Sequence, residues 1–280
     1  MTVADIMTNP DLQQVTIDGE TRLYAIIGDP IAQVKSPRVL NPRFVAAGMD
    51  AVMVPVHVKP DRFDATVKGL MAIGNLDGII VTVPYKARIL PLLDHVLPMA
   101  AKVGAANALR REPDGSWSGD MFDGRGLVRG LRSAAITLEQ RRIMLVGAGG
   151  AGSAVAVALA DAGAAAITIF DVDRHKAETL ASRVAAAFPA CDVRSGPVQL
   201  TGQDTIVNAT PIGMAPGDGL PAPLDGLSAN TLVIDVIIKP ETTPFLDRAR
   251  AIGCRTFNGR VMLEGQAEEL ALFFGAGGRS

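Results

Sequence analysis

Apolar and polar residues follow one another along the chain in two patterns that predict strands and helices in turn. Short apolar runs predict strands at residues 24–28, 51–58, 78–83, 142–146, 166–171, 205–208 and 232–235. Periodic apolar positions predict helices at 37–47, 62–73, 86–94, 98–103, 124–135, 150–163, 174–187 and 261–274. A Pro-Asp-Gly turn between residues 106–110 and 117–119 predicts a short hairpin. Because strands alternate with helices, we expect an α/β fold made of βαβ units with right-handed crossovers.

The pattern starts afresh after the helix at 124–135, which divides the chain into two α/β domains. A length of 280 residues is typical of two domains, and 48% hydrophobic with 20% charged residues excludes general disorder. We place the domains at residues 22–126 and 127–247. Residues 1–21 are polar and aperiodic, which predicts a loose extension.

Composition excludes several classes of function. The 27 basic and 29 acidic residues give a net charge of -2, which offers nothing to attract nucleic acid. No apolar run reaches the roughly 18 residues of a membrane span, and the N-terminus lacks the pattern of a secretory signal. Two cysteines indicate free thiols and a cytoplasmic protein. The three histidines are too scattered for a metal site, and neither a GxSxG nor a Walker A motif is present.

One glycine-rich motif predicts dinucleotide binding. It follows the strand at 142–146, opens the next helix, and comprises Gly147, Ala148, Gly149, Gly150, Ala151 and Gly152. Its glycines permit a tight turn, a close approach to the pyrophosphate and close contact between helix and strand. The following strand ends in an acid, Asp171, as this fingerprint requires. A Rossmann domain is therefore expected over residues 127–247.

Seven further strings, in order and spacing, resemble the shikimate/quinate dehydrogenase family from about residue 24 to residue 274. They are GDPIAQVKSP (28–37), VTVPYK (81–86), GAANAL (104–109), GDMFDGRG (119–126), NATPIGM (208–214), DVIIKPETTPFL (235–246) and GCRTFNGRVMLEGQ (253–266). The resemblance implies an N-terminal substrate domain, a cleft between the domains, and a C-terminal segment (248–280) that packs back onto the first domain.

The same resemblance implies a role for particular residues. Lys86 and Asp123 are expected to be the catalytic pair that exchanges a proton with the reacting hydroxyl, and either of them is able to carry it. The substrate hydroxyls are expected to hydrogen-bond Thr82, Asn107 and Gln266. The substrate carboxylate is expected to bind Ser36. The cofactor is expected to contact Asn208, Met214 and Gly259.

The chain also departs from the family pattern near the expected substrate carboxylate. Val34 stands where the family usually has a serine, and Ile238 stands where it has a tyrosine. Ile80, Met121 and Phe122 replace an asparagine and an Asn-Thr pair. Since three of these changes remove hydroxyl or amide groups, we predict altered recognition of the carboxylate.

The residues after the second Rossmann strand, Asp171-Val172-Asp173, predict NAD rather than NADP. A carboxylate at Asp171 is suited to the ribose hydroxyls of NAD and repels a 2′-phosphate. Arg174 and Lys176 are the only nearby cations able to compensate.

Together these features predict an enzyme that transfers a hydride between NAD and a shikimate- or quinate-like cyclic hydroxy acid, as in aromatic amino acid biosynthesis. Two alternatives stay open: a methylenetetrahydrofolate-type dehydrogenase, and a dinucleotide-binding regulator of the same fold without turnover. A small-molecule substrate is the only partner expected, and a homodimer is compatible with the sequence.

Overall fold

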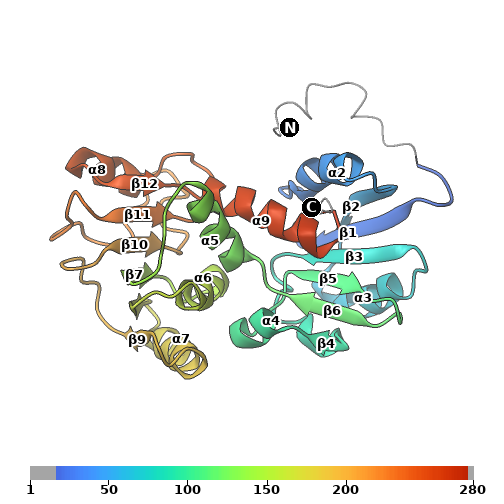
Figure 1. The fold of residues 1–280 in the computed structure, drawn as a ribbon, viewed down its shortest axis with the longest axis horizontal. Coiled ribbons are helices and arrows are strands. Elements are labelled where there is room, and N and C mark those ends of the chain that lie inside the picture. The colour runs from blue at the N-terminus through green and yellow to red at the C-terminus, as the bar shows by residue number, and fades with distance from the viewer. Residues whose placement is uncertain (1–16, 277–280) are drawn as a thin grey trace. The chain divides into compact units, whose positions relative to one another are not determined.

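The computed structural model describes residues 17–276, which form two compact units of helices and strands (Figure 1). Unit 1 contains the described residues up to Phe122 together with those from Ala267, and unit 2 contains Asp123–Gln266. Residues 1–16, most of the predicted polar extension, lie outside the described part of the chain. Each unit is built on a six-stranded sheet.

The sheet of unit 1 is mixed. Its strands are β1 (Arg22–Gly28), β2 (Ala51–His57), β3 (Leu76–Val81), β4 (His95–Val96), β5 (Ala108–Arg111) and β6 (Trp117–Asp120), in the order β2-β1-β3-β5-β6-β4. Strand β1 is parallel to β2 and β3, whereas the predicted hairpin β5–β6 joins the sheet antiparallel to β3. The carboxyl ends of β1 and β3 therefore lie at the same edge as the start of β5.

Helices cover both faces of this sheet. They are α2 (Ser36–Ala46), α3 (Phe63–Met71), α4 (Pro98–Val103), the single turns η2 (Pro60–Arg62) and η3 (Leu90–Leu92), and the last residues of α9 (Arg260–Phe273). Because successive side chains of a strand point to opposite faces, Ile27 packs with Phe63 on one face and Ile26 packs with Phe44 on the other. The second cluster also contains Phe274, so the end of the C-terminal helix, from Ala267 on, belongs to unit 1, whereas residues 248–266 belong to unit 2.

The sheet of unit 2 is entirely parallel. Its strands are β7 (Arg142–Val146), β8 (Ala166–Phe170), β9 (Asp192–Ser195), β10 (Thr205–Asn208), β11 (Leu232–Asp235) and β12 (Arg255–Phe257). Their spatial order is β12-β11-β10-β7-β8-β9. Counted from β7, and read from β9, this is the order 3-2-1-4-5-6 of the Rossmann fold. The prediction of a Rossmann fold is confirmed.

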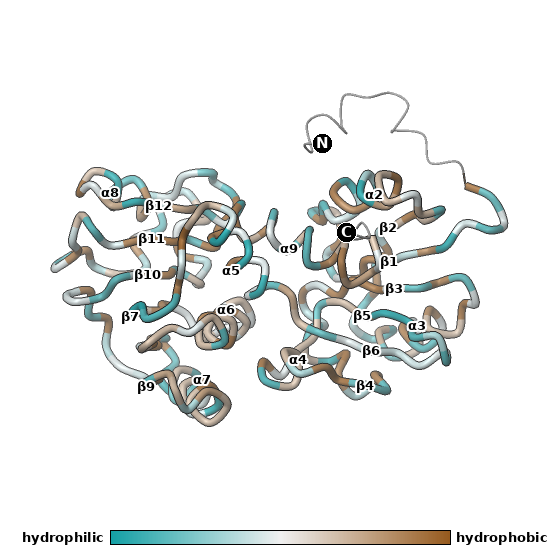
Figure 2. The backbone as a smooth tube through the Cα atoms, viewed as in Figure 1, coloured by the Kyte–Doolittle hydropathy of each residue, from teal (hydrophilic) through white to brown (hydrophobic). Residues whose placement is uncertain are grey.

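The helices of unit 2 are α5 (Asp123–Ser133), α6 (Gly150–Asp161), α7 (Arg174–Ala187), α8 (Pro244–Ile252) and the first part of α9. Helix α6 is almost entirely apolar and buried, and the tube in Figure 2 is tan to brown along much of it. Its small alanine side chains allow the close packing that a central helix of this fold requires.

Two kinds of difference separate the predicted elements from the observed ones. The helix predicted over residues 86–94 is wrong: the structure has only the turn η3 there, because Pro91 offers no backbone N–H to continue a helix. Strands β4, β9 and β12 and helix α8 were not predicted. The three strands are short, and β9 is a half-exposed edge strand without an apolar run.

Candidate active site and cofactor site

Two of the predicted substrate residues lie side by side at the carboxyl edge of the unit 1 sheet. Thr82 directly follows β3, and its backbone N–H donates to the carbonyl of Ile27 at 2.9 Å. The N–H of Val81 donates to the carbonyl of Asn107 at 2.8 Å, so Asn107 is held next to the end of the same strand. The antiparallel arrival of β5 is what brings the two residues together.

Asn107 also positions the chain that leads toward Asp123. Its side chain is 1% exposed, and Oδ1 accepts a hydrogen bond from the backbone N–H of Phe122 at 2.9 Å. Its own N–H donates to the carbonyl of Asp120 at 3.0 Å. Asn107 thus fixes the backbone of residues 120–122, which directly precede Asp123.

The backbone around Lys86 is anchored by its neighbours. The carbonyl of Lys86 accepts the N–H of Ala106 at 2.8 Å, and the preceding Tyr85 is fully buried. The Tyr85 hydroxyl donates to the carbonyl of Val58 at 2.6 Å, and its ring stacks on Phe63 at a centroid distance of 4.3 Å. Lys86 therefore follows a rigid anchor and is itself half-buried. Ser36, the first residue of α2, is half-buried at another loop of unit 1.

In unit 2, Asp123 and Gln266 lie in direct contact although 143 residues separate them. Gln266 Nε2 donates to Asp123 Oδ1 at 2.5 Å, and Asp123 is 5% exposed at the first position of α5. The contact requires α5 and α9 to approach backbone to backbone. A Cβ on Gly265 would lie 2.1 Å from the carbonyl oxygen of Gly126, so only glycine allows this approach.

The glycine-rich loop has the geometry of an anion-binding turn. Gly147 has a φ of 108°, and a Cβ on Gly152 would lie 2.0 Å from the Gly147 carbonyl oxygen. A Cβ on Gly149 or Gly150 would meet nothing within 4 Å, so the approach to the loop is open. No side chain caps the N-terminus of α6, whose first N–H groups are therefore suited to a pyrophosphate. The residues present thus fit a dinucleotide.

Asp171 has backbone partners in its own loop. Its Oδ2 accepts the N–H of Ala148 at 2.7 Å, and its Oδ1 accepts the N–H of Asp173 at 2.9 Å. The carboxylate ties the glycine-rich loop to the start of α7. Asp173 in turn caps α7 by accepting the backbone N–H of Lys176, and this hydrogen bond lowers the pKa of Asp173.

On the other side of the glycine-rich loop, Asn208 is fully buried at the end of β10. Its side chain hydrogen-bonds Asp235, a fully buried residue at the end of β11 that sequence reasoning missed. The sequence signal for Asp235 is an acid at the end of the apolar strand at residues 232–235. Met214 is 56% exposed, and Gly259 packs against the end of β11, where a Cβ would lie 2.1 Å from the carbonyl oxygen of Val236.

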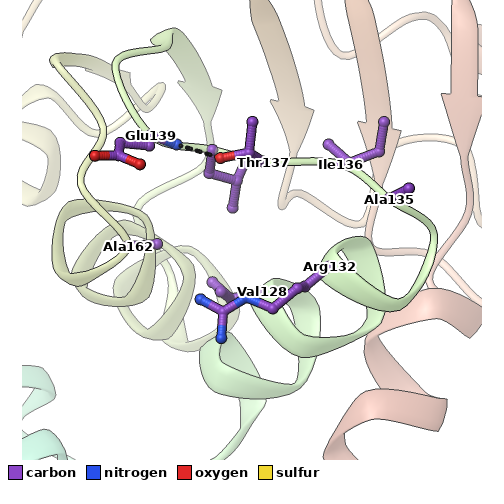
Figure 3. Close-up of a pocket in the computed structure, with 8 residues that line it drawn as sticks. Val128, Arg132, Ala135, Ile136, Thr137, Glu139 and Ala162 are labelled. Carbon is purple, nitrogen blue, oxygen red and sulfur yellow. Dashed lines mark hydrogen bonds between the residues drawn. The ribbon is translucent and has the colours of Figure 1, made fainter.

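A separate pocket of about 300 Å³ opens at the end of α5 (Figure 3). It is lined by Val128, Arg132, Ala135, Ile136, Thr137, Leu138, Glu139 and Ala162. These residues lie at the amino end of β7, opposite the edge that carries the glycine-rich loop. Since dinucleotides bind at the carboxyl ends of the strands, this pocket is not part of the candidate cofactor site.

The described residues contain neither a candidate metal centre nor a membrane-spanning helix. No group of three or more His, Cys, Asp and Glu side chains within residues 17–276 is placed to hold a metal ion. The helices in that part of the chain all fall short of the length and apolarity needed to cross a membrane.

Comparisons with known proteins agree with this geometry. Residues 26–109 match the family model of the shikimate dehydrogenase substrate binding domain, and residues 131–212 match that of shikimate / quinate 5-dehydrogenase. A shikimate dehydrogenase (NADP(+)) from Geobacter sp. strain M21 is 38% identical over 263 residues, which cover 91% of this chain and 90% of the relative.

Two solved structures are similar to this chain over nearly its whole length. Shikimate 5-dehydrogenase from Listeria monocytogenes, in complex with shikimate and NAD, has a TM-score of 0.86 at 30% identity and covers 93% of this chain and 92% of its own. The ligand-free 5-ketofructose reductase of Gluconobacter sp. strain CHM43 has a TM-score of 0.83 at 33% identity, with 92% and 94% covered. Neither the methylenetetrahydrofolate-type dehydrogenase nor the regulator without turnover is favoured by these relatives.

The relatives contradict the prediction of NAD as cofactor. The Geobacter relative and that of Citrifermentans bemidjiense, 36% identical, are both named as NADP(+) enzymes. The physical reason lies at the start of α7, where the exposed cations Arg174 and Lys176 offset the negative charges of Asp171 and Asp173. Asp171 is also oriented by its own loop, since it accepts the N–H groups of Ala148 and Asp173.

Proposed function

Because the chain belongs to the shikimate/quinate dehydrogenase family, we propose that it is an NADP-dependent enzyme that interconverts a secondary alcohol and a ketone on a shikimate- or quinate-like ring. The observation that carries this proposal is the open, uncapped N-terminus of α6 behind the glycine-rich turn, within a sheet of Rossmann order.

The bound cofactor would accept or supply the hydride. The protein's own residues have the remaining tasks. Lys86 and Asp123 take the hydroxyl proton when the alcohol is oxidised and return it when the ketone is reduced. Gln266, which donates to Asp123 Oδ1, orients that carboxylate. Thr82 and Asn107 hydrogen-bond the other hydroxyls of the ring, and Ser36 hydrogen-bonds the substrate carboxylate.

Recognition of the 2′-phosphate is assigned to the first turn of α7. Arg174 and Lys176 lie there, with side chains 91% and 62% exposed, and the first turn contains no acidic residue. The nearby carboxylate of Asp173 already accepts the Lys176 N–H. Arg174 pairs with Glu178 at 2.7 Å and Lys176 pairs with Asp173 at 3.5 Å, and exposed pairs of this kind are weak enough for a 2′-phosphate to compete with the carboxylates. These two cations provide the charge that a 2′-phosphate needs.

A second candidate substrate is an uncharged polyhydroxy ketone. Val34 packs against the apolar cluster that contains Leu40 and Phe122, and Ile238 is 40% exposed. Neither side chain is able to donate a hydrogen bond to a carboxylate. The Gluconobacter relative is named as a reductase of 5-ketofructose, a sugar without that group.

A spectrophotometric assay at 340 nm tests these proposals. Shikimate and quinate are offered with NADP and with NAD, and 5-ketofructose is offered with the two reduced cofactors. We expect turnover with NADP or its reduced form. Turnover of 5-ketofructose alone supports the second candidate, and absence of turnover with every combination contradicts both.

A further inference from the structure

A buried polar network lies at the carboxyl ends of β10 and β11. Asn208, Asp235 and Thr243 are each 0% exposed. Asp235 Oδ1 accepts Asn208 Nδ2 at 3.1 Å and the N–H of Ile237 at 3.0 Å, while Oδ2 accepts the hydroxyl of Thr243 at 2.7 Å. One carboxylate thus joins the ends of two strands to the N-cap residue of α8.

The Asp235 carboxylate depends on the groups that donate to it. Burial raises the pKa of Asp235 above its ordinary value, which means that the surroundings disfavour its charge. Three donors offset that cost, and without the carboxylate all three would be left without this acceptor. The carboxylate therefore fixes the orientation of the groups that donate to it.

The groups so fixed belong to two loops at the edge of the sheet. Asn208 Oδ1 accepts the N–H of Thr210 at 3.0 Å and its hydroxyl at 2.7 Å, and Asn208 Nδ2 lies 3.3 Å from the carbonyl oxygen of Ile212. Asn208 therefore holds residues 209–213. Asp235 holds the other loop directly, through the N–H of Ile237.

The strand order says which part of a dinucleotide these loops face. In the order 3-2-1-4-5-6 each half of the sheet takes one mononucleotide, and the glycine-rich turn with its following acid takes the adenosine half. β10 and β11 are strands 4 and 5, so their ends face the nicotinamide half. The 209–213 loop also touches the glycine-rich turn, since a Cβ on Gly147 would lie 2.8 Å from the Ala209 carbonyl.

We propose that Asp235 is a positioning residue for the nicotinamide half of the cofactor. It contacts no cofactor atom itself, and it acts through Asn208 and Thr243 on the two loops that do. This inference rests on the proposed NADP dependence.

Isothermal titration calorimetry with two ligands tests it. NADP carries both halves, whereas adenosine 2′,5′-bisphosphate carries only the adenosine half with its 2′-phosphate. Asp235→Asn keeps the shape but replaces one acceptor oxygen by a donor. We expect its Kd for NADP to rise at least about tenfold, equivalent to about 1.4 kcal/mol, and its Kd for the bisphosphate to stay within about twofold.

Two further variants separate positioning from general weakening of the fold. Thr243→Val removes one donor and should raise the Kd for NADP about threefold, and Thr243→Ser, which restores the hydroxyl, should return it to the wild-type value. Val233→Ala, at a fully buried position of the same strand, should lower the Tm while both Kd values stay unchanged.

The outcomes distinguish the inference from the function on which it rests. Wild-type protein that binds neither ligand overturns the proposed function. Wild-type protein that binds both, together with a Thr243→Val or Asp235→Asn variant that weakens both equally or weakens neither, overturns the positioning role. If Asp235→Asn does not fold, the Thr243 pair decides alone.

Discussion

The two units place their candidate sites at the same kind of edge but build them from different atoms. In unit 2 the cofactor site consists of backbone: a glycine turn and the open N–H groups at the start of α6. In unit 1 the substrate site consists of side chains, among them Thr82, Asn107 and Lys86, that come from separate loops around a mixed sheet.

This difference shows which of the two candidate sites changes its ligand specificity most readily through single substitutions. A site made of backbone requires glycine at a few positions and tolerates most residues at the others. Its sequence motif therefore stays recognisable. A side-chain site changes with each substitution, and Val34 and Ile238 stand where the family pattern predicts side chains that hydrogen-bond. The glycine-rich motif of unit 2 therefore predicts the reaction class, whereas the substrate depends on single side chains such as these two.

The largest effect is expected at the catalytic pair. Lys86→Ala or Asp123→Asn should lower kcat by about 10²–10⁴-fold, because each removes a partner in proton transfer. The Kd for NADP, measured by calorimetry, should hardly change for Lys86→Ala, since Lys86 belongs to unit 1. A Lys86 variant that keeps its kcat on the true substrate contradicts the assignment.

A smaller but still large effect is expected from the backbone site. Gly152→Ala places a Cβ 2.0 Å from the Gly147 carbonyl oxygen, so the turn must shift and the Kd for NADP should rise about 30-fold or more, equivalent to about 2 kcal/mol. Gly69→Ala in α3 is the matched control, because its Cβ also meets nothing within 4 Å and the position lies outside the glycine-rich loop. Equal Kd values for the two variants argue against a site made of backbone.

The two exposed cations assigned to the 2′-phosphate should give an intermediate effect. The double variant Arg174→Ala and Lys176→Ala removes two positive charges from the first turn of α7, and its Kd for NADP should rise about tenfold. NAD, which lacks the 2′-phosphate, is the internal control and should bind as before. A parallel loss for NAD means that the two side chains support the fold rather than the phosphate.

The smallest effect concerns the substrate side. Val34→Ser together with Ile238→Tyr restores two hydroxyls and should lower the KM for shikimate severalfold, because the net gain from an added hydrogen bond in water is only about 0.5–1.5 kcal/mol. Measured with 5-ketofructose, the KM of the same variant should not fall. If neither KM changes, the carboxylate is held elsewhere, with Lys35 and Arg125 as the next candidates.

The sequence by itself determined the features that depend on near neighbours. Strand β7 and helix α7 have the bounds that the apolar pattern predicts, and the glycine motif identified the dinucleotide unit. Apolar periodicity decides which face of a strand or helix is buried, and a glycine turn is specified by a few consecutive residues. These signals are complete within a window of about 20 residues.

Only the tertiary structure decided which polar groups meet. Asp171 stands where a ribose ligand is predicted, and its oxygens accept the N–H groups of Ala148 and Asp173, contacts that the sequence alone does not reveal. Asp123 meets Gln266, and Asp235 meets Asn208 and Thr243, across loops whose closure no local pattern records. A carboxylate in a string shows that a charge is present, but its partners, and hence its role, depend on contacts that form when distant segments pack.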